Sequence, residues 1–263
     1  EYHYTLYYYD LAANLVKTIP PAGVNVSKFG WTTSWSDSVK AARKNNQVLP
    51  VPHSLPSEYR YNTLNQLEAL KSPDGGLTEF WYDRLGRLAL SRNAKQLAAS
   101  SSAYHLFSYT RYDNLGRITE VGQLRDTATV TAVGNALTRN GTNFSNWSNL
   151  RTHYRHQVTQ TVYDTAFWTG PYNPLTVYQR NLRNRVSFVA LYDTTASAIA
   201  YNNAVFYTYD ILGNVDTLLN DYGYGADATS LWNMMNRNGN RWKKIVYNYD
   251  LISGKVNTVA YQR

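Results

Sequence analysis

The stretch Tyr112-Asp113-Asn114-Leu115-Gly116-Arg117-Ile118 predicts a β-hairpin. Tyr112 ends an extended run, and Asp113 suits the first position of a type I turn because its carboxylate can accept backbone N–H groups two residues further on. Gly116 stands at the position that needs a positive φ, where a side chain would be strained. Arg117 and Ile118 then begin the return strand, as in hairpins that combine a type I turn with a bulge.

The same phrase returns along the chain, which indicates a repeat architecture. With two further complete copies and three variants, the predicted turn residues are Tyr9, Asp10, Tyr61, Asn62, Tyr82, Asp83, Gly86, Tyr112, Asp113, Gly116, Tyr209, Asp210, Gly213, Tyr249, Asp250 and Gly254. In two variants Ala13 or Asn65 stands where the glycine is expected, and the turn after Tyr249 has one extra residue. Tyr163-Asp164 and Tyr192-Asp193 are interpreted as decayed copies without the glycine.

The composition favours a strand-rich protein. The chain contains 24 Tyr, and only 17% of its residues are charged, which argues against a coiled coil or a charge-rich disordered chain. The net charge is +8, but the Lys and Arg residues are scattered, so a solvated surface of mixed charge is favoured over nucleic-acid binding. Cysteine is absent, which excludes disulfides. We expect no membrane span, because the sequence holds no run of 18 apolar residues.

The predicted fold is all-β, with repeated hairpins that form a curved or spiralling sheet and short helices in the insertions. Hairpins are predicted over residues 1–19, 59–70, 77–90, 104–121, 205–219 and 245–261, and further strands over 152–163 and 180–192. Short helices are predicted over 36–44 and 227–236, and a loop or short helix over 91–103. Asn140-Gly141 predicts a hairpin turn, Gly170–Pro174 a turn, and 143–149 a loop. We expect residues 1–263 to form a single repeat region, a fragment of a much larger chain.

The repeated phrase closely resembles the RHS or YD repeats. The resemblance rests on Tyr82–Leu88, Tyr112–Ile118 and Tyr209–Val215, with the variants at Tyr9, Tyr61 and Tyr249, and it spans almost the whole chain. Residues 14–18 and 72–76 are similar to the large RHS proteins of Bacteroidetes-type bacteria. The resemblance implies a β-sheet ribbon that spirals into a hollow shell, either around a toxic C-terminal domain or as a cell-surface scaffold, as in teneurins. The Asp-Pro motif of the self-cleaving shell end is absent from this sequence.

The resemblance also implies a function. We expect a structural segment of a shell that encloses or presents a toxin or effector domain of a secreted bacterial protein, at the cell surface or outside the cell. Its expected partners are the remainder of its own shell and the enclosed effector, with secretion machinery or surface glycans as further candidates. We expect no enzymatic activity, cofactor or nucleic-acid partner.

Two alternatives stay open. A surface adhesin or glycan-binding scaffold would use aromatic residues of the insertions, for which Trp31, Trp35, Trp147 and Trp168 are the candidates. A glycosidase, a more distant alternative, would use paired turn carboxylates drawn from Asp10, Asp83, Asp113, Asp210 and Asp250. His153 and His156 have a spacing that suits two metal ligands on a helix, but their segment is predicted to be extended, so no metal site is expected.

Overall fold

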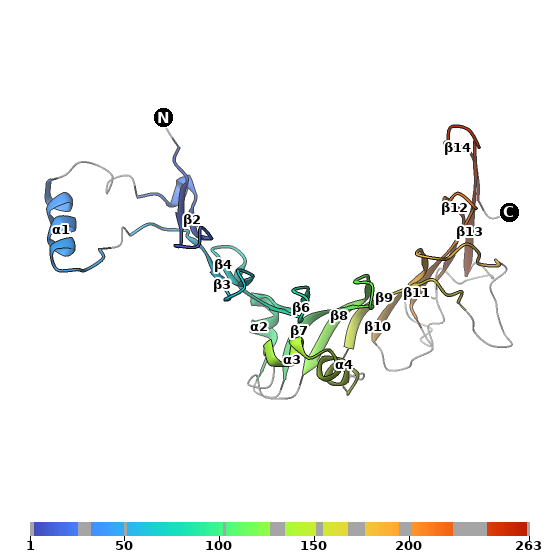
Figure 1. Cartoon of the computed structure of the whole chain (residues 1–263), viewed down its shortest axis with the longest axis horizontal. Helices are drawn as coiled ribbons and strands as arrows, with labels where there is room; N and C mark the ends of the chain where they lie inside the picture. The colour runs from blue at the N-terminus through green and yellow to red at the C-terminus, as the bar shows by residue number, and fades with distance from the viewer. Residues whose placement is uncertain are drawn as a thin grey trace. The chain divides into compact units, whose positions relative to one another are not determined.

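The computed structural model describes residues 3–25, 33–49, 52–101, 104–126, 135–150, 155–167, 177–194, 201–222 and 241–261. The predicted turn at 170–174 and the predicted helix at 227–236 lie outside these ranges. Fourteen strands and a few short helices make up the described residues (Figure 1). The paired strands run antiparallel to their neighbours, which confirms the predicted all-β class built from hairpins.

The chain divides into two compact units, of which the first is Glu1–Ser101. Its strands pair in sequence order: β1 (Leu6–Tyr9), β2 (Leu15–Ile19), β3 (Ser57–Tyr61), β4 (Leu67–Ser72), β5 (Gly76–Tyr82) and β6 (Leu88–Arg92). A short 3-10 helix (Pro21–Gly23) and α1 (Thr33–Lys44) lie between β2 and β3, and α2 (Ala94–Ala99) follows β6. Successive strands are joined mainly by tight turns, so neighbours in the sequence are neighbours in the sheet.

The second unit is Ser102–Arg263. Its strands also pair in sequence order: β7 (His105–Tyr112), β8 (Ile118–Asp126), β9 (Arg155–Tyr163), β10 (Val186–Thr194), β11 (Asn203–Tyr209), β12 (Val215–Asp221), β13 (Trp242–Tyr249) and β14 (Val256–Tyr261). Helices α3 (Asn135–Arg139) and α4 (Gly141–Leu150) lie between β8 and β9. The prediction of a single repeat region over 1–263 stays a prediction.

Each predicted Tyr-Asp hairpin carries the same irregularity in its strand pairing. The register shifts immediately before the turn tyrosine in all six of these hairpins, at Tyr9, Tyr61, Tyr82, Tyr112, Tyr209 and Tyr249. A bulge places one extra residue on one strand and increases the local twist. The hairpins therefore share a bulged closure as well as a sequence phrase.

The core of the second unit is an aromatic cluster on one face of its sheet. Phe188, Tyr201 and Phe206 are buried there together with Leu219, and Phe167 packs against them. The centroid of the Phe167 ring lies 4.8 Å from that of Phe188 and 4.9 Å from that of Phe206. Alternate residues along β11 are buried, because successive side chains of a strand point to opposite faces.

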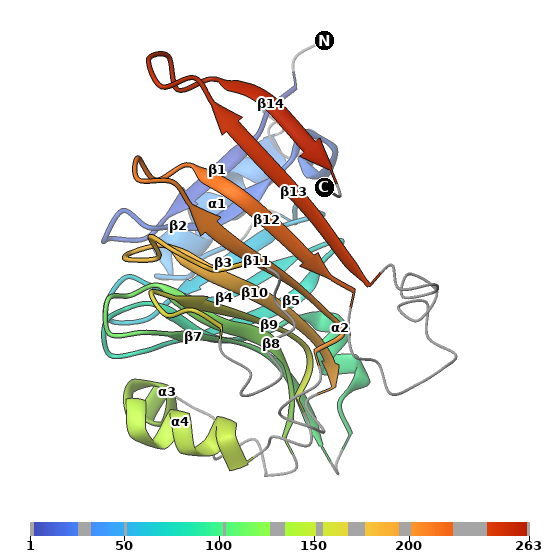
Figure 2. The same cartoon turned by 90° about the vertical axis from the view of Figure 1, so that its right-hand side faces the viewer.

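The region around Asn140-Gly141 differs from the prediction. Asn140 separates two helices rather than two strands, and its side-chain Oδ1 accepts the backbone N–H of Asn143 at 3.0 Å, as a helix N-cap does. The predicted loop at 143–149 is part of α4. Phe144 and Trp147 share one side of that helix, and the Trp147 ring lies 6.4 Å from that of Phe107 in β7. Packing of α4 against the β7–β8 region (Figure 2) therefore outweighs the local turn preference.

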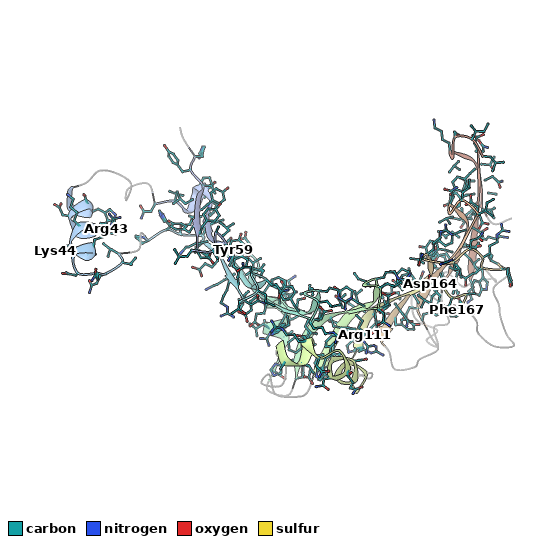
Figure 3. The ribbon with its side chains drawn as sticks, in the orientation of Figure 1. Arg43, Lys44, Tyr59, Arg111, Asp164 and Phe167 are labelled. Carbon is teal, nitrogen blue, oxygen red and sulfur yellow. The ribbon has the colours of Figure 1, made fainter. Side chains whose placement is uncertain are left out.

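The other short helices were largely predicted. Helix α1 begins at Thr33, earlier than the predicted residue 36. Arg43 and Lys44 lie exposed in its last turn, where cations favour the helix dipole (Figure 3). Helix α2 carries a capping box between Asn93 and Gln96. No helix in the described part of the chain is long and apolar enough to span a membrane.

Candidate functional site: the Tyr-Asp turns

The residue after the turn tyrosine, an aspartate in every copy except Asn62, holds its own loop closed. In the turn after Tyr112, the Asp113 carboxylate accepts the backbone N–H groups of Leu115 and Arg117, both at 2.9 Å, and Arg117 Nε at 2.7 Å. The main chain closes the same loop, since Asp113 N–H donates to the Arg117 carbonyl at 2.9 Å. Asp83 makes the corresponding bonds to its own turn. These bonds satisfy the polar groups of a tight turn and fix its shape.

A left-handed backbone recurs at one position of the turns. Gly116 has φ 82°, and the equivalent residues are Ala13 (62°), Asn65 (56°), Gly86 (79°), Gly213 (98°) and, after the extra residue, Gly254 (67°). The variant turns thus adopt the geometry of the complete copies. Asparagine tolerates this conformation better than most residues, whereas a β-branched residue there is strained.

We expect Gly116→Val to lower the free energy of unfolding by about 1–3 kcal/mol, because valine is forced to a positive φ. The Gly116→Asn variant is the matched control, since Asn65 occupies the same position of another turn at φ 56°. Urea denaturation of both variants measures the difference. Equal stabilities of the valine and asparagine variants would contradict the assignment of strain to this position.

The turn tyrosine joins each hairpin to the hairpin before it. In five junctions its hydroxyl donates to the carbonyl of the aliphatic residue that begins the preceding return strand, at 2.8–3.1 Å: Tyr61 to Leu15, Tyr82 to Leu67, Tyr163 to Ile118, Tyr209 to Val186 and Tyr249 to Val215. We call these contacts the inter-hairpin tyrosine bonds. At each of these five junctions the tyrosine is therefore the donor, and the first residue of the preceding return strand supplies the acceptor.

Strand register is the same at these five junctions. The residue two after the aliphatic residue pairs with the residue three before the tyrosine: Lys17 with Glu58, Ala69 with Glu79, Glu120 with Gln160, Phe188 with Phe206 and Thr217 with Val246. A shift by one residue would turn every side chain to the other face of the sheet. At these five junctions, each hairpin therefore pairs with the preceding one in the same register and through the same hydrogen bond.

We expect Tyr209→Phe to lower the free energy of unfolding by about 0.5–1.5 kcal/mol, because it removes the 2.8 Å bond to the Val186 carbonyl and keeps the ring. Tyr207→Phe, two residues earlier on β11, is the control, because no inter-hairpin tyrosine bond involves Tyr207. Thermal or urea unfolding measures both. If the two variants lost the same stability, the bond would not be the cause.

Tyr163-Asp164 is half of a split turn. Asp164 N–H donates to the Arg185 carbonyl at 3.1 Å, the Asp164 carboxylate accepts the N–H of Asn184, and Asn184 has φ 57°. Asn184-Arg185-Val186 thus takes the place of the Gly-Arg-aliphatic end of the phrase, separated from its beginning by an insertion. The sequence Asn184-Arg185-Val186 resembles the end of the phrase, with Asn184 in the place of the glycine. Only the fold shows that this segment lies next to Asp164.

Tyr192-Asp193 is not a copy of the turn, so that interpretation was wrong. It lies at the end of β10 that leads to β11, whereas the split turn lies at the other end, between β9 and β10. Asp193 N–H donates to the Asn202 side chain, and Tyr192 donates to Gln160 on the neighbouring strand. The dipeptide Tyr-Asp alone, without the rest of the phrase, does not indicate at which end of a strand a repeat turn lies.

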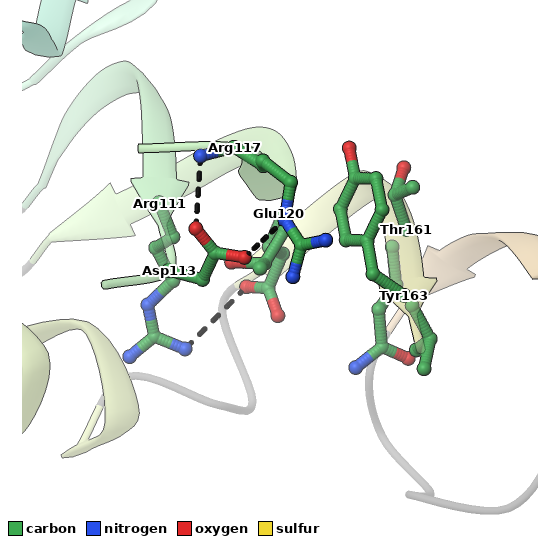
Figure 4. A pocket seen from close by; sticks show the side chains of 9 residues that line it. Arg111, Asp113, Arg117, Glu120, Thr161 and Tyr163 are labelled. Carbon is green, nitrogen blue, oxygen red and sulfur yellow. Dashed lines mark hydrogen bonds and ion pairs between the residues drawn. The ribbon is translucent and has the colours of Figure 1, made fainter. Parts of the chain in front are cut away.

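Arg117 links two successive turns. Its guanidinium contacts Asp113 in its own turn at 2.7 Å and Asp164 in the next at 2.6 Å, and lies 4.2 Å from the centre of the Tyr163 ring. Figure 4 shows Asp113, Arg117 and Tyr163 around a hollow of about 410 Å³ that Glu120 also lines. Hydrogen bonds from Arg117, followed by that from Asn184 N–H, lower the pKa of Asp164. The hollow holds paired charges of both signs.

Turn carboxylates should make stability depend on pH. Hydrogen bonds lower the pKa of Asp10, chiefly from Asn14, of Asp164, chiefly from Arg117, and of Asp250, chiefly from Ser253, below the ordinary value of 3.8. Because the folded-state pKa is depressed, the stabilisation is present above pH 3.8 and is lost as the pH falls through the lowered folded value. We therefore expect the urea midpoint to fall on acidification below about pH 4.

The control for this pH dependence is Asp164→Asn, which removes one titrating group while an amide can still accept the turn bonds. Asn62 already accepts the N–H groups of Leu64 and Gln66 in this way. The slope of stability against pH should be smaller for the variant than for the natural chain. A natural chain whose urea midpoint stays constant between about pH 5 and pH 2 would contradict the prediction.

Two buried Tyr–carboxylate–Arg groups were not predicted from the sequence. Glu120 accepts the Tyr109 hydroxyl and Arg155 Nη1, both at 2.6 Å. Asp221 accepts the Tyr201 hydroxyl and two Arg241 nitrogens at 2.6–2.7 Å. Burial, followed by the neighbouring carboxylate, raises the pKa of both tyrosines, so the phenols stay protonated. Their members come from different strands or strand ends, which no sequence spacing reveals.

The residues considered for catalysis, metal and glycan binding have other contacts. Asp10, Asp113 and Asp210 each accept backbone N–H groups of their own turn. Among the residues that the structure describes, no group of three or more His, Asp or Glu side chains could hold a metal ion. Trp147 packs against Phe144 and donates to Asp126. Trp31, Trp168 and His153 lie outside the described residues, while Trp35 lies on α1 and His156 on β9.

Comparison with known proteins finds no matching family model and no matching curated protein. Among solved structures, the crystal structure of TcdB2-TccC3 is 15% identical, with a TM-score of 0.49 over 98% of this chain and 9% of that one. The crystal structure of TcdB2-TccC3-Cdc42 is 14% identical, with a TM-score of 0.28 over 98% of this chain and 13% of that one. A mutant Tc holotoxin pore of Photorhabdus luminescens is 12% identical, with a TM-score of 0.24 over 99% and 14%. The chain thus spans 9–14% of the length of these chains.

Proposed function

We propose that the chain is a structural segment of an RHS-type repeat wall, without enzymatic activity of its own. The observation that carries this proposal is the recurrence of the inter-hairpin tyrosine bonds at one strand register. Every such bond joins a hairpin to its predecessor, so the sheet grows by one hairpin at a time. A repeat protein gains its stability from contacts between neighbouring units in this way.

In this proposal the wall encloses or presents a toxin or effector domain of a secreted bacterial protein, as the resemblance to RHS repeats implies. The turn carboxylates support a structural role, because their oxygens are occupied by the loops that they close. The partners are then the rest of the wall and the effector. The proposed enclosing role is supported by the resemblance of the repeated phrase to RHS repeats. The repeat-wall role is supported by the inter-hairpin tyrosine bonds.

A tagged form of the chain, isolated from the cells that produce it, tests this role. We expect it to co-purify with a polypeptide that resists added protease until the assembly is denatured, with mass spectrometry identifying the protected fragments. The Gly116→Val variant should increase access of protease to that polypeptide, while Gly116→Asn should not. Recovery of the chain without any protected polypeptide would contradict the enclosing role.

The same preparation distinguishes the alternatives. An adhesin or glycan-binding scaffold would bind a glycan array, and the matched changes Trp35→Ala and Trp147→Ala would show which insertion is responsible. A glycosidase would hydrolyse aryl glycosides, with activity reduced by Asp113→Asn. The contacts of Trp147 with Phe107 and Phe144 argue for packing rather than sugar binding at that residue.

A further inference from the structure

A short segment of the chain fills the gap between β10 and β11 at the end of the strands that carries the turns. The Gln179 side chain donates through Nε2 to the carbonyl of Ser187 at 2.7 Å and to that of Tyr207 at 2.9 Å. Ser187 belongs to β10 and Tyr207 to β11, and both lie beyond the point where the two strands pair directly. We call this place, which holds residues 179–181, the filled gap.

The main chain of the segment makes two further bonds in the filled gap. Tyr209 N–H donates to the Arg180 carbonyl at 3.3 Å, and Arg185 Nη1 donates to the Asn181 carbonyl at 2.6 Å. Arg185 is the residue before Val186, the aliphatic residue that begins the return strand. Every residue of a peptide has a main-chain carbonyl, so these two bonds do not depend on the side chains of the segment.

The corresponding gap one hairpin earlier, between β8 and β9, is the hollow of about 410 Å³. Thr119, Thr161 and Tyr163 line it together with Arg117 (Figure 4). Counted from the aliphatic residue and the tyrosine of each junction, the first three are the equivalents of Ser187, Tyr207 and Tyr209. Direct pairing of β8 with β9 ends at the same register as that of β10 with β11. Strands β7 and β10 flank this pair, so the hollow lies within the sheet and not at its edge.

Arg117 has an unused donor in this hollow. It precedes Ile118 as Arg185 precedes Val186, so the two arginines are equivalent. Arg117 Nη1 is buried and has no hydrogen-bond partner among the described residues, whereas Arg185 Nη1 bonds to the Asn181 carbonyl. A buried donor without an acceptor is costly. The two gaps therefore offer the same donor, and only the filled gap supplies its acceptor.

We propose that the hollow between β8 and β9 binds an extended segment of another polypeptide, in the way that the filled gap holds residues 179–181. A glutamine of that segment donates to the carbonyls of Thr119 and Thr161. Arg117 donates to the main-chain carbonyl two residues after the glutamine. The proposal goes beyond a wall that only supports its own neighbours, because it gives the wall a site for a second chain.

The lining of the hollow also limits the chemistry of the bound segment. Arg111 lies 3.7 Å from Glu120 and Arg117 lies 2.7 Å from Asp113, so charges of both signs are already paired. Gln160 stands at the register position that Phe206 occupies at the filled gap. An aromatic side chain therefore lacks the partners that Phe167 has there, and we expect an uncharged, polar segment.

An acetylated and amidated peptide of residues 177–182 with Arg180→Ser is the probe. Arginine is replaced because Asp216, which binds Arg180 in the filled gap, corresponds to Ser187 at the hollow. Isothermal titration calorimetry with the full chain should give a dissociation constant of about 0.1–1 mM, because a short peptide loses its freedom for few bonds. The same peptide with Gln179→Leu should bind about tenfold more weakly, since it lacks the amide donor.

Two arginine variants of the full chain test the donor. Arg117→Lys keeps the charge but loses the planar fork that reaches two carboxylates and a carbonyl together, so it should weaken peptide binding about fivefold. Arg87→Lys makes the same change at the same position of the Tyr82 turn and should leave binding unchanged. Circular dichroism and melting show whether both variants are folded.

Photo-crosslinking locates the bound peptide in the natural chain. With benzoylphenylalanine in place of Tyr178 of the peptide, mass spectrometry should find crosslinks in β8, β9 and the turn residues 113–117. Crosslinks confined to β10 and β11 would mean that the peptide had displaced residues 179–181, and would overturn the proposal.

Two further results would contradict the binding site. One is no heat of binding at a peptide concentration of about 5 mM. The other is binding that is equally strong with the Gln179→Leu peptide and with the Arg117→Lys chain. The inference does not depend on an enclosed effector, because peptide binding tests the hollow and protease protection tests the enclosing role.

Discussion

Replacing Asp221 by alanine should lower the free energy of unfolding by about 3–5 kcal/mol. Asp221 is fully buried at the end of β12 and accepts the Tyr201 hydroxyl at 2.6 Å. It also accepts Arg241 Nε at 2.6 Å and Nη2 at 2.7 Å. Alanine removes the carboxylate that neutralises a guanidinium held near the sheet interior, and the cost of that uncompensated charge exceeds the loss of a hydrogen bond alone.

Urea denaturation, followed by circular dichroism, measures this effect. Asp37→Ala on α1 is the control, because Asp37 contacts Lys40 at 3.4 Å and both side chains are exposed. Exposed ion pairs contribute about 0–1 kcal/mol, so the control should lose little stability. Similar losses in the two variants would show that burial of the Tyr201–Asp221–Arg241 group does not determine its contribution.

Replacing Phe206 by alanine should also cost about 3–5 kcal/mol, because it leaves a cavity in the aromatic cluster of the second unit. Phe206 is 1% exposed, and the centroid of its ring lies 4.9 Å from that of Phe167 and 5.5 Å from that of Phe188. These rings come from β11, from β10 and from the residues that follow β9. The substitution should therefore weaken the packing of Phe167 together with that of the strands.

Leu212→Ala is the control from the same hairpin, because Leu212 lies in the β11–β12 turn and is 62% exposed. It removes apolar atoms without making a cavity and should change stability by less than about 0.5 kcal/mol. Hydrogen exchange of the β10–β12 amides, with urea denaturation, measures both variants. If the β10–β12 amides exchanged faster in Leu212→Ala but not in Phe206→Ala, the assignment of Phe206 to the core would be contradicted.

Most of the turn geometry was predictable because its determinants are local. Asp113, Gly116 and Arg117 lie within one short phrase, and the bonds that close the loop join residues at most four apart. Asn65 and Ala13 adopt the same left-handed backbone as glycine because the same phrase surrounds them. The helix α4 was missed because the preference of Asn140-Gly141 for a hairpin turn competes with packing of Phe144 and Trp147, which only the sheet provides.

By itself, the sequence determined that the chain contains a series of β-hairpins whose repeated turns are closed by an aspartate or asparagine and by a residue with a left-handed backbone. Only the tertiary structure decided what the tyrosines do. Their hydroxyls donate to carbonyls of other hairpins, and Asn184 reaches Asp164 across an insertion. These contacts join residues far apart in the chain, and their energies depend on burial and distance. Residue type and spacing are sufficient to predict a turn, but the pairing of the strands decides which other hairpin its tyrosine contacts.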